Sequence, residues 1–201
     1  MLDEAVIQRT LGAALRTGGE WAEIFVEDKR SSSAVLDDGK VEELTSGRDR
    51  GAGIRVVVGE TTGFAHTADL SEDGLRTAAE AAAAAARGGS GGTQVVDLAR
   101  HTAPRPNEVS VAPEDVAKAT KVELLTRADQ VARSQGSAIT QVMARYGDSR
   151  RKILIANSDG LLTGDDQVKT LFSVSCVAFG DTGMQTGRES IGHTIGFELF
   201  D

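Results

Sequence analysis

Histidine is the residue type best suited to hold a metal ion or to move a proton near neutral pH. The sequence has three, His66, His101 and His193, and none of them is followed by glutamate. No two have the i, i+4 spacing that places two imidazoles on one helix face around a zinc ion. We therefore predict no local zinc motif and no metal site in these 201 residues, with His66 and His193 at exposed polar positions.

Carboxylate pairs and a nucleophile motif occur in the sequence, but in settings that do not favour catalysis. Asp165-Asp166 and Glu42-Glu43 are adjacent residues, which point to opposite faces of an extended chain and so cannot converge on one bond. The run 88–92 has the spacing of the Gly-x-Ser-x-Gly nucleophile elbow, yet it follows a helical pattern, whereas the elbow joins a strand to a helix. We interpret the pairs as solvated and the run as a flexible linker.

Charge and glycine spacing argue against nucleic acids and nucleotides as partners. The formal net charge is −8 with acids and bases interspersed, whereas phosphate binding needs clustered Lys and Arg. Gly51-x-Gly53 lacks the third glycine of the dinucleotide fingerprint, because Val56 stands at that position and a strand pattern follows.

Compartment and redox state are indicated by the termini and by cysteine usage. No apolar run approaches the roughly 20 residues that span a bilayer, and the acidic start Met1-Leu2-Asp3-Glu4 is unlike a signal peptide. We expect a cytoplasmic protein with no membrane partner. The single cysteine, Cys176, excludes an internal disulfide, and its strand-like surroundings predict a buried structural thiol.

The first half predicts two helices and an antiparallel sheet. Val6, Ile7, Leu11, Ala14 and Leu15 share one face of an N-terminal helix that Gly18-Gly19 ends. Ser71 is a suitable N-cap for a helix through the alanine run 78–86, which Arg87-Gly88 ends. Short strands are expected at 21–27, 31–36, 40–44, around Arg55 and from Phe64, with turns at 37–39 and 59–63.

The second half predicts one helix and further strands. Pro113 suits the first helical position, with Ala117, Leu124, Ala128 and Val131 on one face and an end near Gly136. Strands are expected at 139–146, 151–157, 161–163 and 168–179, with turns at 147–149 and 158–160. The predicted fold class is α+β, with antiparallel β-sheets, three main helices and a weak internal duplication.

We place the domain boundary where glycine and proline gather. Residues 1–92 hold the N-terminal helix, the β-meander and the alanine-rich helix, and residues 93–112 form a Pro-containing connection. Residues 113–201 hold a helix followed by antiparallel strands.

The order of glycines, strands and helix resembles the TldD/PmbA family, the modulators of DNA gyrase, over essentially the whole chain. The motifs that carry the resemblance are Arg50-Gly51-Ala52-Gly53-Ile54-Arg55-Val56, Gly59-x-x-Thr62-Gly63-Phe64-Ala65, Leu70-Ser71, Ala22-Glu23-Ile24-Phe25, Leu36-Asp37-Asp38-Gly39, Asn157-Ser158-Asp159-Gly160 and Gly192-x-x-x-Gly196-Phe197-Glu198. Two segments are more similar to the TldD branch of the family than to its partner branch. They are Ser-Gly-Arg-Asp-Arg-Gly at 46–51 and Gly-Phe-Glu-Leu-Phe at 196–200.

This resemblance implies a zinc metallopeptidase in which two paralogous subunits, one catalytic and one without metal, enclose a cavity that admits unfolded peptides. Its implied substrates include precursor peptides and small antitoxin-type proteins. The family's metal motif, His-Glu-x-x-x-His, has no match here. We therefore expect zinc only in a full-length protein, a C-terminal metallopeptidase domain after residue 201, and no peptide hydrolysis by these residues alone.

Arg55 and Thr62, Gly63 and Phe64 are our candidates for lining the peptide channel or contacting the second subunit. In the other interpretation the glycines only shape turns and Phe64 fills the core. At the level of function, the alternatives are a non-catalytic binding module, such as a metal-free PmbA/TldE-like partner, and an unrelated small enzyme that uses His66 or His193.

Overall fold

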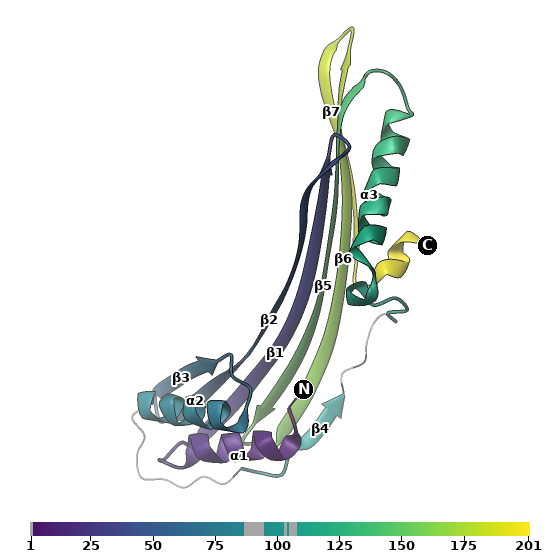
Figure 1. The fold of residues 1–201 in the computed structure, drawn as a ribbon. Helices are drawn as coiled ribbons and strands as arrows, with labels where there is room; N and C mark the ends of the chain where they lie inside the picture. Colours follow the sequence, from purple (N-terminus) through teal and green to yellow (C-terminus); the bar gives the residue numbers. More distant parts are fainter. Residues whose placement is uncertain (1, 87–94, 103, 105–107) are drawn as a thin grey trace. The chain divides into compact units, whose positions relative to one another are not determined.

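A computed structural model describes residues 2–86, 95–102, 104 and 108–201 (Figure 1). Its three helices and seven-stranded sheet confirm the predicted α+β class. The elements are α1 Glu4–Leu15, β1 Trp21–Asp37, β2 Lys40–Val58, β3 Thr61–Thr67, α2 Glu72–Ala85, β4 Ala99–Thr102, α3 Lys118–Arg133, β5 Ile139–Asn157, β6 Leu161–Gly180 and β7 Gly183–His193, with 3-10 turns at Pro113–Asp115 and Phe197–Phe200.

The strand order in the sheet is β3-β2-β1-β5-β6-β4, and β7 also pairs with β6. The β2–β3 and β6–β7 pairs are antiparallel, as predicted, whereas β4 runs parallel to β6. The order of elements also repeats, because α1 and α3 are each followed by three strands of which the last two form an antiparallel pair. The predicted internal duplication is therefore visible in this order.

Four strands are much longer than predicted. The pairs of short strands expected at 21–36, 40–58, 139–157 and 161–179 are single strands of 17, 19, 19 and 20 residues. The expected turn at 147–149 is extended backbone inside β5. Turn residues express only a local preference, and pairing with neighbouring strands overrides it. The turn at Asp38-Gly39 is confirmed, with φ of 50° and 76°, the positive values that a type I′ hairpin requires.

The chain forms two compact units whose segments alternate along the sequence. Unit 1 comprises Met1–Asp28, Asp49–Pro104 and Arg151–Asp166, and unit 2 comprises Lys29–Arg48, Arg105–Arg150 and Gln167–Asp201. Each of the four long strands contributes to both units. The sequence boundary at 93–112 stays a prediction. The structure adds a strand, β4, within that connection, and the predicted linker 88–92 lies outside the described residues.

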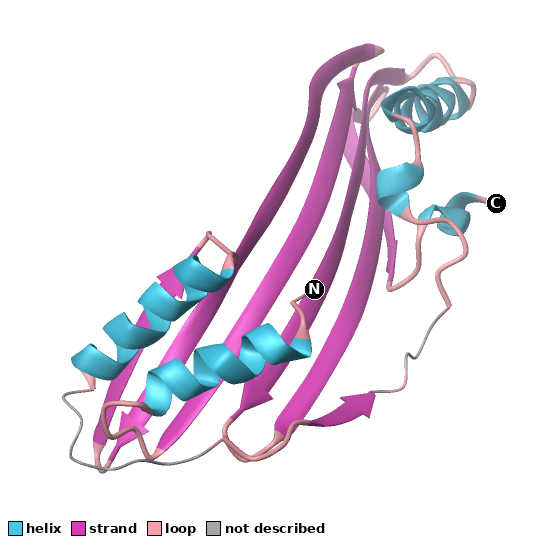
Figure 2. Cartoon of the chain, turned by 60° about the horizontal axis from the view of Figure 1, so that its bottom comes forward, coloured by secondary structure: helices cyan, strands magenta, loops and turns pink. Residues whose placement is uncertain are grey.

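Helices α1 and α2 lie side by side on one face of the unit 1 sheet (Figure 2). Ser71 is the N-cap of α2, as predicted, and accepts a hydrogen bond from the Gly74 amide at 3.2 Å. The structure adds Asp3 as the N-cap of α1, where it accepts a hydrogen bond from the Ala5 amide at 2.9 Å. Burial of their apolar faces against the sheet forms the core of the unit. Its fully or nearly fully buried members include Ile7, Leu11, Leu15, Ala22, Ile24, Val26, Ile54, Val56, Leu75, Ala79, Ala82, Leu154, Ala156 and Leu162.

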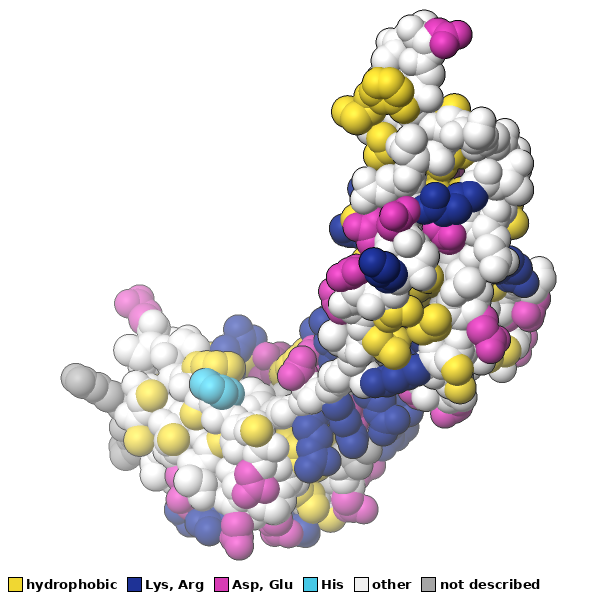
Figure 3. All heavy atoms as spheres, turned by 45° about the horizontal axis from the view of Figure 1, so that its top comes forward, with side chains coloured by type: hydrophobic (Ala, Val, Ile, Leu, Met, Phe, Trp, Pro, Cys, Tyr) yellow, Lys and Arg dark blue, Asp and Glu magenta, His cyan; other side chains and the backbone are white. Residues whose placement is uncertain are grey.

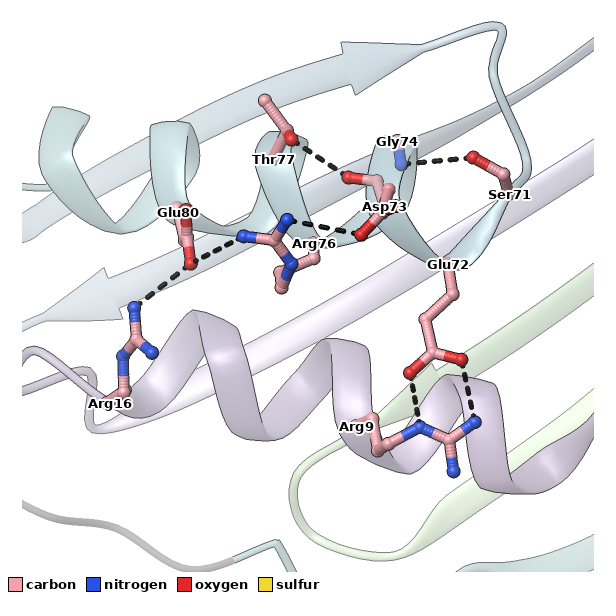
Figure 4. Close-up of polar contacts among 9 residues, drawn as sticks. All are labelled: Arg9, Arg16, Ser71, Glu72, Asp73, Gly74, Arg76, Thr77 and Glu80. Atoms are coloured by element: carbon pink, nitrogen blue, oxygen red, sulfur yellow. Dashed lines mark hydrogen bonds and ion pairs between the residues drawn. The ribbon is translucent and has the colours of Figure 1, made fainter.

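Ion pairs join the exposed sides of the two helices (Figure 4). The Arg9 guanidinium donates two hydrogen bonds to Glu72, at 2.5 and 2.9 Å, and Arg16 lies 3.0 Å from Glu80. The Arg9 hydrogen bond lowers the pKa of the Glu72 carboxyl. Because all four side chains are exposed, water screens these pairs, and the buried alanines and leucines beneath them supply most of the helix packing energy.

In unit 2, α3 differs from its prediction at its start and on its buried face. Pro113 begins a three-residue 3-10 turn, and the helix starts only at Lys118 because Val116 is extended. Lys121, Leu124 and Leu125 are buried, whereas Val131 is 57% exposed. Two charged residues, Lys121 and Asp129, also lie on the buried side of the helix, where each forms an ion pair. A pattern of hydrophobic residues cannot indicate buried positions of this kind. The surrounding core comprises Ala34, Leu36, Ala144 and Tyr146, with Phe172, Val174, Phe197 and Phe200 partly buried against it.

Glu198 ties the last turn of the chain to the segment before α3. Its carboxylate accepts hydrogen bonds from the backbone amides of Ser110, Val111 and Gly196, at 3.0, 2.9 and 3.0 Å. Burial by itself would raise the pKa of this carboxyl, but hydrogen bonds from the backbone outweigh it, and the pKa is lowered. The ionised form is therefore the one that the fold stabilises.

We expect Glu198→Gln to lower the melting temperature at pH 7. A lowered pKa stabilises the folded state above the ordinary carboxyl pKa, and that contribution is lost as the pH falls through the folded value. The difference in melting temperature between the two proteins should therefore shrink below about pH 4. Thermal unfolding at pH 3, 4, 5 and 7 measures this difference in melting temperature. A difference that does not change with pH would contradict the role of the ionised carboxylate.

Candidate functional site

The four predicted site residues lie on the β2–β3 hairpin of unit 1 but do not all face the same way. Arg55 pairs with Phe64 and Val57 with Thr62, so these side chains share one face of the sheet. Gly63 pairs with buried Val56 on the opposite face, beneath α2. A Cβ built on Gly63 would lie 1.9 Å from the Ala82 carbonyl oxygen and 2.5 Å from the Ala86 nitrogen. Gly63 therefore permits close helix packing, and the other three residues form the surface.

We call the sheet surface that faces away from α1 and α2 the open face of unit 1. Along β1, Ala22, Ile24 and Val26 are buried under the helices, and the residues between them are half-buried on the open face. On β1, β2 and β3 the open face includes Trp21, Glu23, Phe25, Gly53, Arg55, Val57, Thr62, Phe64 and His66. Figure 3 shows one surface of the molecule, on which basic, acidic and hydrophobic side chains are exposed side by side and a histidine lies next to hydrophobic atoms.

Arg55 is held in place by two neighbours on β1. Its Nη2 lies 3.2 Å from Glu23 Oε1, and its guanidinium carbon lies 5.0 Å from the centre of the Trp21 ring. The Trp21 indole in turn donates a 2.8 Å hydrogen bond to Asp159. A cation above an aromatic face is attracted by the ring quadrupole, and the Glu23 carboxylate fixes its direction. The open face thus carries an oriented guanidinium beside an aromatic plane.

Phe64 is 61% exposed, so the interpretation that it fills the core is wrong. Its ring lies over Gly53, where a Cβ would approach the ring atoms at 3.0 Å, and it stacks on His66 with 6.3 Å between ring centres. Because β3 is the first strand in the sheet order, this exposed aromatic pair stands on an edge strand. Such a surface can bind apolar groups and extended backbone.

A buried polar cluster in unit 2 was missed by the sequence reasoning. Lys121 Nζ donates hydrogen bonds to Ser32 Oγ and Asp148 Oδ2, both at 2.7 Å, and Ser32 donates to the same carboxylate. The Lys121 and Asp148 side chains are 4% and 6% exposed. The nearby Tyr146 hydroxyl is buried and has no hydrogen-bond partner among the described residues, and its pKa is raised by burial and by the Asp148 charge.

This cluster combines a serine and a lysine, but its geometry does not favour nucleophilic catalysis. A lysine that removes a proton from serine must accept a hydrogen bond from the hydroxyl, whereas Lys121 donates to Ser32 Oγ and to the Asp148 carboxylate. We interpret the cluster as a buried ion pair that holds α3 to the sheet. The available signal was the spacing of Lys121 three and four residues before Leu124 and Leu125, on the side of the helix that is buried.

Histidine and cysteine positions test the remaining predictions. His66 and His193 are exposed, as predicted. Cys176 is half-buried and not buried as predicted, because it pairs across the β6–β7 ladder with Gly187, which has no side chain to cover the thiol. Within residues 2–86, 95–102, 104 and 108–201, no group of three or more His, Cys, Asp or Glu side chains could hold a metal ion. Among the same residues, no helix is long and apolar enough to cross a membrane.

Family models match most of the chain. Residues 22–86 match PmbA/TldA metallopeptidase domain 1, and residues 112–201 match the PmbA/TldA metallopeptidase central domain. The chain belongs to the PmbA/TldD family, as its glycine-rich motifs predicted.

Known relatives agree with this membership. The metalloprotease TldD homolog of Haemophilus influenzae is 29% identical over 188 residues, which cover 90% of this chain and 38% of the relative. A Thermotoga maritima protein described as a modulator of DNA gyrase has a similar fold, with a TM-score of 0.79, 18% identity, and coverage of 98% of this chain and 44% of that one. TldE from Thermococcus kodakarensis matches with a TM-score of 0.78, 14% identity, and coverage of 94% and 43%. The chain spans about two fifths of the length of the Haemophilus relative.

Proposed function

We propose that these residues form the substrate-enclosing and subunit-pairing part of a TldD-type zinc metallopeptidase that acts on unfolded peptides or small proteins. Family membership supports the reaction class. The observation that carries the proposal is the open face of unit 1, where Arg55 of β2 and Phe64 of the edge strand β3 are both exposed. In the full-length protein the zinc is held by residues of another domain, and the cytoplasm is the proposed compartment.

An unfolded peptide binds this surface in an extended conformation. Main-chain hydrogen bonds to the free edge of β3 are insensitive to peptide sequence, which suits an enzyme for unfolded substrates. Alternate peptide side chains then reach the open face, where Trp21 and Phe64 offer aromatic surface. Arg55 is already oriented by Glu23 and Trp21, so little conformational entropy is lost when it contacts a peptide carbonyl.

The open face beside this edge has a second role in this proposal, contact with a paralogous subunit. The fold is shared with a protein named TldE, which supports a paralogue of this kind as the partner. Neither nucleic acid nor membrane is a direct partner. The zinc content of the full-length protein distinguishes the catalytic member of the pair from the metal-free member. Stoichiometric zinc with peptide hydrolysis supports the catalytic role, and a zinc-free protein that only enhances cleavage by a paralogue supports the PmbA/TldE-like role.

Replacing Arg55 with alanine in the full-length protein tests the open face. We expect cleavage of denatured casein to fall roughly 5- to 30-fold, because one oriented guanidinium contact contributes about 1–2 kcal/mol. The matched control is Arg16→Ala, which removes an exposed arginine at the C-terminal end of α1, on the other face of the sheet. Cleavage kinetics and subunit assembly are measured together. Unchanged cleavage with intact assembly would remove Arg55 from the site.

A further inference from the structure

A groove of about 380 Å³ lies on the unit 2 sheet, outside the surface described so far. Three strands line it: β5 with Met143 and Arg145, β6 with Ser173 and Ser175, and β7 with Thr186, Gly187 and Arg188. Ser175 pairs directly with Arg188 across the β6–β7 ladder. Phe172 and Val174 pack against the core that contains Leu124 and Leu125 of α3. Because side chains alternate along a strand, Ser173 and Ser175 point to the opposite face, which α3 does not cover.

The groove is cationic in an acidic protein. Its lining includes two arginines and three hydroxyl groups but no carboxylate, although the chain has a net charge of −8. In the part of the chain that the structure describes, neither Arg145 nor Arg188 forms an ion pair. Within the described residues, the Arg145 Nε donates a hydrogen bond to the Met143 sulfur, at 3.2 Å. Both guanidinium groups therefore remain available to an anionic ligand.

Exposed apolar side chains flank the groove along the same strands and on the same face. Leu171 lies two residues before Ser173 on β6, and Phe179 lies four residues after Ser175. Phe179 pairs with Met184 of β7, and the two side chains are 63% and 67% exposed. With a rise of about 3.3 Å per residue, Leu171 and Phe179 are about 26 Å apart. The surface therefore alternates along β6 from apolar to cationic and back to apolar.

We propose that this groove binds a carboxylate of an extended peptide, whose apolar residues on either side contact Leu171 and the Phe179–Met184 pair. Arginine recognises carboxylates through charge-assisted and often bidentate hydrogen bonds, and the serine and threonine hydroxyls can donate further ones. This inference rests on the proposed function, since the peptide is the substrate of the same protein. It adds a preference for acidic, partly apolar segments, set by Arg145 and Arg188.

Fluorescence anisotropy with the full-length protein tests the groove. The first probe is a labelled 13-residue peptide with an amidated C-terminus, a central Glu, and Leu and Phe four residues to either side. The second probe replaces the Glu with Gln, and the third keeps the Gln but has a free C-terminal carboxylate. Tight binding of the first probe identifies an acidic side chain as the ligand, and tight binding of the third identifies the peptide C-terminus.

The double variant R145Q/R188Q is expected to weaken binding of the preferred carboxylate probe by about tenfold or more, and to leave the neutral probe unchanged. Arg16→Gln, an exposed arginine of unit 1, is the matched control. Thermal unfolding verifies that the double variant is folded, which its exposed positions favour. Equal binding of all three probes by the unsubstituted protein, or an unchanged preference in the double variant, would overturn the proposal.

The two proposals fail in distinguishable ways. If the unsubstituted protein cleaves denatured casein but binds charged and neutral probes equally, only the groove assignment is wrong. If it neither binds nor cleaves any peptide, in the presence or absence of a paralogous subunit, the proposed function is wrong and the groove assignment with it.

Discussion

Lys121→Met is expected to lower the free energy of unfolding by about 3–5 kcal/mol, because it leaves the Asp148 carboxylate buried without its cation. Methionine is an unbranched side chain one atom shorter than lysine and keeps most of the packing near Tyr146, so the loss reports on charge more than on volume. Urea unfolding of the chain, followed by circular dichroism, measures the change. Lys118→Met is the matched control, since this lysine is exposed on the same helix and its replacement should change stability by less than about 0.5 kcal/mol.

A double variant distinguishes the cost of an unpaired buried charge from the cost of losing the hydrogen bonds to Ser32. In K121M/D148L both charges are replaced by apolar side chains, and buried ion pairs replaced in this way often lose little stability or gain some. We therefore expect the double variant to recover most of the stability that the single variant loses. If the double variant is as unstable as K121M, the contribution lies in the hydrogen bonds to Ser32 and not in the unpaired charge.

Gly63→Ala is expected to destabilise unit 1 by about 3 kcal/mol, although it adds a single methyl group. The new Cβ would meet the backbone of α2, at 1.9 Å from the Ala82 oxygen, so the helix must move away from the sheet. Buried alanines such as Ala79 and Ala82 would then lose contact with β2 and β3. Thermal unfolding measures the loss of stability.

The control for Gly63 is another glycine of the same unit. Gly12 lies on the exposed side of α1, and a Cβ there would meet nothing within 4 Å. Gly12→Ala should therefore raise stability by about 0.5–1 kcal/mol, since alanine is the better helix former. Opposite signs for the two substitutions would identify packing as the cause. A small effect at Gly63 would show that α2 can shift at little cost.

Much of the fold was predictable from local signals. The Ser71 cap and the alanine run predicted α2, and the Asp38-Gly39 pair predicted a hairpin turn, because each needs only contacts between residues a few positions apart. The continuity of β5 through residues 147–149 was not predictable, because pairing with strands distant in sequence decides it. The same holds for the start of α3, where a suitable proline began only a 3-10 turn.

The candidate sites likewise combine features that the sequence predicted with features that it could not predict. The alternation of strand residues by itself determined that Arg55 lies apart from the buried positions of its strand, and the glycine-rich motifs determined the family, whereas the exposure of Phe64 came from the structure. Only the tertiary structure decided that Lys121 meets Asp148, that Gly63 lies under α2, and that Arg145 and Arg188 line one groove. A residue's own preference acts over a few positions, whereas these contacts depend on which distant strands and helices lie next to each other.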